Sequence, residues 1–158
     1  MSVMDNIFDL TRGNEPRYER KFFISNSTLY EIKSLIKLHP VCFKEVFPQR
    51  RVNNIYLDSF GLENYLDNKF YLLQLRVSSL NNYFRQYYVS ADKKFRLTLD
   101  FDLCFCKPEK LIERDNSNCI LELKYDYEYD DDARNVSAEF PFRMTKSSKH
   151  TMGIEKLS

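Results

Sequence analysis

The chain has 158 residues, of which 43% are hydrophobic and 30% charged, a composition that suits one globular domain, 1–158, and excludes a disordered protein. Its 24 basic and 23 acidic residues give a formal net charge of +1. Proteins that coat nucleic acid depend on a large positive excess, so we expect no nucleic-acid partner. A near-neutral total still allows cations to gather at one place on the fold.

The start of the chain and its cysteines indicate a cellular compartment. Residues 1–15 contain no basic segment followed by an apolar one, so we expect no signal peptide. Because no apolar stretch reaches membrane-spanning length, we expect a cytoplasmic protein without direct membrane insertion. The cysteines lack the paired spacing of thiol metal sites and are interpreted as reduced structural residues. They are Cys42, Cys104, Cys106 and Cys119.

In chain order, residues 1–14 form a lead-in and residues 17–24 an aromatic-rich strand. Apolar residues at helical spacing predict a helix over residues 29–38, which Pro40 ends. The three residues before it, 25–27, are the candidates for its N-terminal cap, with Glu31 as their partner. The candidates are Ser25, Asn26 and Ser27.

Several strands follow the helix. Alternating or aromatic-rich runs predict them at residues 52–58, 70–77, 82–90, 94–105 and 119–127. The interval 60–80 is ambiguous, since residues 62–66 also fit a helical turn. Residues 106–118 are polar enough for a loop. The acidic residues 130–132 are interpreted as a solvated loop that leads into a short helix or turn near Ala133, and residues 141–150 as a polar, basic tail.

Side chains alternate across a strand, so each predicted strand divides into two rows. In the strand at 94–105 one row is wholly apolar: Phe95, Leu97, Leu99, Phe101 and Leu103. The other row is Arg96, Thr98, Asp100 and Asp102, where the carboxylates are interpreted as partners for arginines. Each polar row carries Arg or Lys. The rows fit a sheet with its polar face in water, and they also fit a barrel with a charged interior. The pattern alone leaves both open.

Six segments, spread over nearly the whole chain, carry a family resemblance. They are RYERK (17–21), VNNIYLD (52–58), NYFRQYY (82–88), FRLTLD (95–100), ILELKY (120–125) and TKSSK (145–149). In this order they resemble the VTC domain, the polyphosphate polymerase module of the triphosphate-tunnel superfamily. The resemblance implies an α+β fold, an antiparallel β-tunnel barrel with flanking helices.

The resemblance also implies an activity. A VTC-type phosphotransferase adds the terminal phosphoryl group of ATP to a polyphosphate chain inside a basic tunnel, with Mn²⁺ or Mg²⁺ as the metal cofactor. Two alternatives stay open, a triphosphate hydrolase of the same superfamily and a non-catalytic polyphosphate-binding module. Product analysis after incubation with ATP and Mn²⁺ separates them.

The motifs also imply roles for individual residues. Catalytic phosphate ligands are expected at Lys21, Arg85, Arg96, Lys124 and Lys149. Substrate-binding residues are expected at Arg17, Tyr83, Lys146 and Ser148, and metal ligands at Glu122 and Glu19. The residues alone allow plainer interpretations. Lys21 and Glu19 also fit a surface ion pair, and Lys146 and Lys149 also fit a solvated tail.

One part of the family pattern is absent. Family members carry a K-x-R-x-R strand and a further E-x-K strand after the segment that corresponds to 52–58, whereas only Lys69 and Arg76 are basic in this interval. The sequence therefore predicts a missing internal block after about residue 68 and an incomplete barrel. Because unpaired strand edges invite pairing with another chain, a homo-oligomer is a candidate assembly. The resemblance implies a membrane-bound partner as a further candidate.

Overall fold

The computed structural model describes residues 17–58, 76–106, 113–146, 149 and 152. These residues form an α+β fold. The strands are β1 Arg17–Ile24, β2 Lys44–Asp58, β3 Arg76–Val89, β4 Arg96–Cys106, β5 Glu113–Asp115, β6 Cys119–Asp126 and β7 Met144–Thr145. The helices are α1 Leu29–Leu38, the 3₁₀ turn η1 Tyr127–Tyr129 and α3 Asp130–Ala138.

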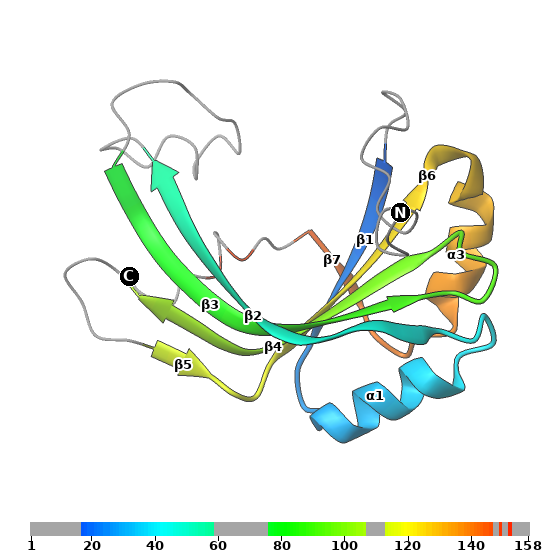
Figure 1. Cartoon of the computed structure of the whole chain (residues 1–158), viewed down its shortest axis with the longest axis horizontal. Helices are drawn as coiled ribbons and strands as arrows, with labels where there is room; N and C mark the ends of the chain where they lie inside the picture. The colour runs from blue at the N-terminus through cyan, green and yellow to red at the C-terminus, as the bar shows by residue number, and fades with distance from the viewer. Residues whose placement is uncertain (1–16, 59–75, 107–112, 147–148, 150–151, 153–158) are drawn as a thin grey trace, which may run out of the picture.

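The strands of the described ranges form one seven-stranded antiparallel sheet. Its order is β2-β3-β4-β6-β1-β7, and β5 pairs with β4 beside this path. The sheet is strongly curved, so that β2 and β3 rise as one arm and β1 and β6 as the other (Figure 1). In the described part of the chain the edge strands β2 and β7 do not pair with each other. The expected α+β fold with an incomplete antiparallel barrel is confirmed.

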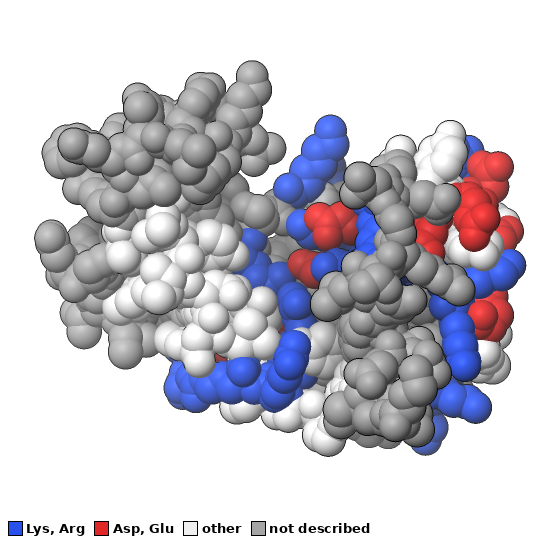
Figure 2. All heavy atoms as spheres, turned by 45° about the horizontal axis from the view of Figure 1, so that its top comes forward, with Lys and Arg blue, Asp and Glu red and all other residues white. Residues whose placement is uncertain are grey.

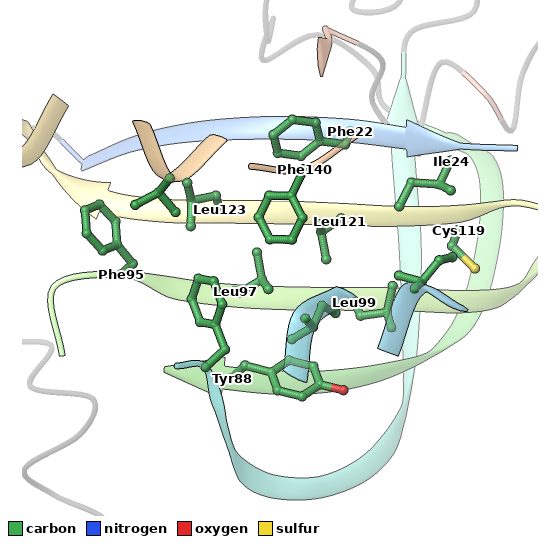
Figure 3. Packing of buried hydrophobic residues seen from close by; sticks show 14 of the residues in the cluster. Phe22, Ile24, Tyr88, Phe95, Leu97, Leu99, Cys119, Leu121, Leu123 and Phe140 are labelled. Carbon is green, nitrogen blue, oxygen red and sulfur yellow. The ribbon is translucent and has the colours of Figure 1, made fainter. Parts of the chain in front are cut away.

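The hydrophobic core lies on the outer, convex face of the sheet, between the strands and the helices (Figures 1 and 3). Helix α1 buries Ile32 and Ile36, which are four residues apart and therefore share one helical face. Helix α3 buries Ala133 and Val136. They cover a strand layer in which Leu97, Leu99, Leu121 and Leu123 are fully buried. Burial of each such leucine contributes roughly 1.5–3 kcal/mol, so this face drives folding and leaves the other face free for polar groups.

Helix α1 has the predicted bounds, 29–38, but its cap is not one of the predicted residues. Thr28 is the cap: its hydroxyl accepts a hydrogen bond from the Glu31 amide at 3.2 Å, and its own amide donates to the Glu31 carboxylate at 2.6 Å. This is a capping box, so Glu31 has the expected role. The choice of Ser25, Asn26 or Ser27 as the cap was wrong, because Thr28 is the residue three positions before Glu31 with extended backbone angles.

The apolar row of β4 changes sides at Asp102. This residue has a φ of 52°, in the left-handed region that Asp tolerates better than most residues, and the register with β3 shifts there. The bulge keeps Phe101 in the outer core and turns Leu103 and Phe105 to the inner face. The prediction of one uninterrupted apolar row was therefore wrong at Leu103.

Other boundaries also differ from those predicted. Strand β2 begins at Lys44, well before the expected residue 52, and β5 lies within the expected loop 106–118. The acidic residues 130–132 form the first turn of α3, where carboxylates are favoured by the helix dipole, and are not a loop. Most of the expected strand 70–77, the helical turn 62–66 and the lead-in lie outside the described residues.

Two observations bear on the expected compartment. Among the helices of the described ranges, none is both long and apolar enough to cross a membrane. The four cysteines are free, and Cys104 and Cys119 are buried. Burial raises the pKa of the Cys119 thiol to about 11, which keeps it protonated at neutral pH. The interpretation of the cysteines as reduced residues is confirmed.

Candidate functional site: a charged inner face

The polar rows of the strands meet on the inner, concave face of the sheet. Glu122 on β6 lies opposite Lys21 on β1 and Thr98 on β4, and Arg85 on β3 lies opposite Asp100 on β4. Directly opposite residues in antiparallel strands point to the same face. Figure 2 shows Lys and Arg side chains, together with Asp and Glu, gathered in the hollow between the two arms of the sheet.

The centre of this face is a buried group of two carboxylates and two cations. Arg85 donates two hydrogen bonds to Asp100, at 2.5 and 2.6 Å, in a bidentate pair. Lys149 Nζ lies 2.7 Å from Asp100 Oδ2 and 2.9 Å from Glu122 Oε1. The exposed fraction is 0% for Asp100, 6% for Glu122 and 8% for Lys149. Lys149 is therefore a buried lysine, and its interpretation as part of a solvated tail was wrong.

These neighbours keep the buried groups charged. Burial by itself raises the pKa of Glu122, but Lys149, Arg85 and Lys124 outweigh it and lower that pKa to about 2. Burial lowers the pKa of Lys149, whereas Asp100 and Glu122 raise it by a larger amount, so the net direction is upward. At neutral pH Glu122 is thus a carboxylate and Lys149 an ammonium.

The charged cluster extends along the sheet toward solvent. Lys124 Nζ lies 3.7 Å from Glu122 Oε2 and 3.9 Å from Glu19 Oε2, and Lys21 Nζ lies 2.7 Å from Glu19 Oε1. This Lys21–Glu19 contact is the strand-surface pair that the residues alone allowed. One carboxylate therefore faces two lysines at this point of the network.

At the far end of β6, Arg17 and Arg96 each lie 4.0 Å from the same oxygen of Asp126. Burial and the neighbouring Arg17 lower the pKa of Arg96, and Asp126 only partly offsets them. Two guanidinium groups facing one carboxylate leave local positive charge without a matching anion.

We call these two groups of ion pairs, taken together, the inner network. It comprises six cations, Arg17, Lys21, Arg85, Arg96, Lys124 and Lys149, and four carboxylates, Glu19, Asp100, Glu122 and Asp126. Among these residues positive charge exceeds negative charge, although the whole chain is nearly neutral.

Tyr83 lies beneath the buried cations. The Lys149 ammonium lies 5.1 Å and the Arg85 guanidinium 5.2 Å from the centre of its ring. Asn54 donates a hydrogen bond to its hydroxyl at 3.2 Å, and burial raises its pKa, so the hydroxyl stays protonated. An apolar cluster continues from this ring: Tyr83, Leu103, Phe105, Ile120 and Met152.

The structure brings most of the expected site residues together. Eight of the eleven belong to the inner network, and Tyr83 contacts two of its cations: the eight are Arg17, Glu19, Lys21, Arg85, Arg96, Glu122, Lys124 and Lys149. Lys146 is exposed just after β7. Ser148 lies outside the described residues.

Two carboxylates of the inner network were not among the expected site residues. Asp100 was expected only as a partner for an arginine, which it is, and it also binds Lys149. Asp102 likewise lies 3.7 Å from Arg114. Asp126 was interpreted only as part of an acidic run. The sequence did indicate the face of Asp100, since Asp100 is in the same row as Arg96, four residues later. It could not indicate which residue of β3 lies opposite Asp100, because the sequence does not specify the register of the two strands.

The carboxylates do not fit a resident divalent metal ion in this arrangement. The oxygens of Glu122 face Lys149, Lys124, Arg85 and the Thr98 hydroxyl, at 2.9 to 3.7 Å. Within the described residues, no group of three or more His, Cys, Asp or Glu side chains is positioned to hold a metal. Glu122 and Glu19 as metal ligands, and Mn²⁺ or Mg²⁺ as cofactor, therefore stay predictions.

Fold and site together define a class of protein: an open, curved antiparallel barrel with helices on its outer face and, on its inner face, a network of cations and carboxylates that is buried at its centre. Residues 72–158, more than half of the chain, match the VTC domain family. The chain belongs to the VTC domain family, which suggests a polyphosphate-related function. No curated protein and no solved structure was found to match it.

Proposed function

We propose that this chain is a VTC-type phosphotransferase that binds a phosphate chain along its inner network and adds the terminal phosphoryl group of ATP to polyphosphate. The observation that carries the proposal is the excess of cations over carboxylates among the described residues of the inner network, six against four. Phosphoryl transfer has little covalent chemistry for a protein to perform. Catalysis depends mainly on aligning the phosphates and neutralising charge on their oxygens.

The arrangement of the inner network supports a direction along which the phosphates lie. Arg17 and Arg96 share one carboxylate, and Lys21 and Lys124 share another, so each pair has charge left for an anion. These pairs lie toward the solvent side of the buried centre, on neighbouring strands. Arg17 lies opposite Asp126 and Lys21 opposite Glu122, so a phosphate chain that runs from the first pair past the second reaches Glu122 and Lys149 next.

A second candidate function is favoured by a separate observation. Glu122 is surrounded by Lys149, Lys124 and Arg85, as described above, which favours a non-catalytic module that binds polyphosphate. A triphosphate hydrolase that uses water as acceptor is the remaining alternative. The edge strand β2 also fits an assembly with a second copy of this chain or with a membrane-bound partner, which we include in the proposal.

The first test is product analysis with the full chain, ATP, and either Mn²⁺ or Mg²⁺. Long-chain polyphosphate supports the phosphotransferase, free phosphate with ADP supports the hydrolase, and binding without turnover supports the module. Lys124→Gln is expected to weaken binding of long-chain polyphosphate about tenfold, since a charge-assisted hydrogen bond contributes roughly 1.5–3 kcal/mol.

Lys37→Gln is the matched control, because Lys37 is exposed in the last turn of α1 on the outer side of the sheet. It is expected to leave binding unchanged. The proposal is wrong if the full chain fails to bind polyphosphate, or if the two substitutions weaken binding equally.

A further inference from the structure

The position of Lys149 Nζ is the starting point. It lies between two carboxylates, 2.7 Å from Asp100 Oδ2 and 2.9 Å from Glu122 Oε1. All three side chains are more than nine-tenths buried. A pair of buried carboxylates on adjacent strands ordinarily needs a shared cation, because two uncompensated negative charges out of water are strongly unfavourable. Here a side chain of the protein supplies that cation.

The charges of the centre balance without any added ion. Asp100 and Glu122 carry two negative charges, and Arg85 and Lys149 carry two positive charges within 3.6 Å of them. A divalent ion entering beside these cations would add two positive charges to a buried, already neutral group. Such an ion would be repelled by Arg85 and Lys149 and would gain little from carboxylates that already have partners.

Lys149 and Met152, the two described residues of this part of the chain, are both held in place. Met152, three residues further on, is buried against Tyr83, Leu103, Phe105 and Ile120. The Lys149 ammonium also lies over the Tyr83 ring. Withdrawing Lys149 from the carboxylates would therefore disturb an apolar contact as well as two hydrogen bonds.

From this geometry we propose that the Lys149 ammonium is the built-in cation of the carboxylate pair Asp100 and Glu122, and that this pair takes no divalent metal ion while Lys149 is present. This inference describes the same site as the proposed function and so deepens it. The evidence for the inference is the geometry of the two carboxylates alone. Its consequence for a phosphate ligand is that any Mn²⁺ or Mg²⁺ needed for turnover arrives on the triphosphate. The ammonium has three hydrogens, and in the described contacts the two carboxylates accept two of them.

The test measures Mn²⁺ binding to the full chain without any phosphate ligand. Electron paramagnetic resonance detects the Mn²⁺ that stays free in solution. Wild type is expected to bind no Mn²⁺ at this pair. Lys149→Met keeps much of the side-chain volume and removes the ammonium that both carboxylates share, and is expected to bind Mn²⁺ at least about tenfold tighter than wild type, because the pair then has one positive charge fewer beside Arg85 and Lys124. The double variant Lys149→Met with Glu122→Gln is expected to lose this binding. Lys146→Met, a change of the same kind at an exposed lysine nearby, is expected to behave as wild type.

Wild-type Mn²⁺ binding that Glu122→Gln abolishes would overturn the proposal, and this comparison is valid even if Lys149→Met does not fold. Absence of Mn²⁺ binding in a folded Lys149→Met chain would overturn it equally. Both measurements differ from polyphosphate binding. If the chain fails to bind polyphosphate but Mn²⁺ binds as expected in the variants, the proposed function is wrong and this inference holds. If polyphosphate binds but the Mn²⁺ results differ from those expected, the inference is wrong and the proposed function holds.

Discussion

Glu122 stays charged in a place where carboxylates are ordinarily protonated. It is 6% exposed, yet its pKa falls to about 2, because burial is outweighed by Lys149, Arg85 and Lys124. Its pKa in the unfolded chain is near 4.5. A folded-state pKa below the unfolded one means that the ionised side chain stabilises the fold at neutral pH, by an amount on the order of 3 kcal/mol.

This shift predicts a specific loss of stability in acid. The contribution of Glu122 is complete above pH 4.5 and is lost as the pH falls toward about 2, because the folded chain then has to take up a proton that the unfolded chain already holds. Urea denaturation between pH 7 and pH 2 measures it. In Glu122→Gln, the free energy of unfolding is expected to fall between pH 7 and pH 2 by less than in wild type, with a difference on the order of 3 kcal/mol.

Glu139→Gln is the control for this profile, since Glu139 is exposed at the end of α3. It is expected to keep the wild-type slope. Equal profiles for wild type and Glu122→Gln would show that Glu122 is not held ionised by its neighbours.

Residue types and spacing predicted which strand residues share the charged face. Period two assigns Arg85, Arg96, Glu122 and Lys124 to the polar row of their own strands, and the pairing of the strands brings these rows to one face. Lys149 could not be placed in this way. It lies in a short basic segment that resembles a solvated tail, and only tertiary contact with Asp100 and Glu122 distinguishes it from the exposed Lys146.

At the scale of elements, the sequence predicted where α1 lies but not which residue caps it. The apolar spacing and Pro40 predicted the bounds of the helix, and Glu31 indicated a capping box. Several small polar residues precede the helix, and each can form a cap. The backbone selects Thr28, the residue whose hydroxyl reaches the amide of Glu31.

This assignment predicts different effects for two neighbouring hydroxyl residues. Thr28→Ala removes the reciprocal hydrogen bonds of the capping box and is expected to lower the free energy of unfolding by about 1 kcal/mol. Ser27→Ala, the matched control, is expected to change it by less than about 0.5 kcal/mol. Chemical denaturation of the two variants measures both. Equal losses, or a larger loss for Ser27→Ala, would contradict Thr28 as the cap.

Strand β4 shows a feature that alternation cannot predict. Its residues alternate without interruption through Asp102, yet the φ of 52° there reverses the faces of the residues that follow. Asp is among the residues that adopt this conformation, but it does so in a minority of cases. The bulge therefore depends on packing: it lets Leu103 and Phe105 meet Tyr83 and Ile120 on the inner face.

At the scale of the whole molecule, the nearly neutral composition does not indicate how the charges are distributed. A formal net charge of +1 is distributed so that cations gather in a concave hollow while the acidic first turn of α3 lies on the outside (Figure 2). The incomplete antiparallel barrel with flanking helices was predicted from the family resemblance. Pattern alone predicted α1 and most strands, but not the pairing of strands far apart in the chain that brings the polar rows together.

The distribution predicts that polyphosphate binding, if the proposed function holds, weakens with added salt. Arg96→Gln is expected to reduce the slope of log affinity against log salt by about one, since each cation that neutralises a phosphate releases about one counterion. Lys37→Gln, on the outer side, is expected to leave the slope unchanged. Binding titrations between low and physiological salt measure both slopes. An unchanged slope for Arg96→Gln would remove Arg96 from the phosphate-binding surface.

The position of Lys149 in the chain has a consequence for folding during synthesis. Strands β1 to β6 are synthesised before residue 149, and domains form progressively as the chain leaves the ribosome. Until Lys149 emerges, Asp100 and Glu122 share only Arg85 as a buried cation. A sheet that forms before Lys149 is synthesised has one positive charge fewer beside these two carboxylates, with Lys124 at 3.7 Å from Glu122 as a further neighbour.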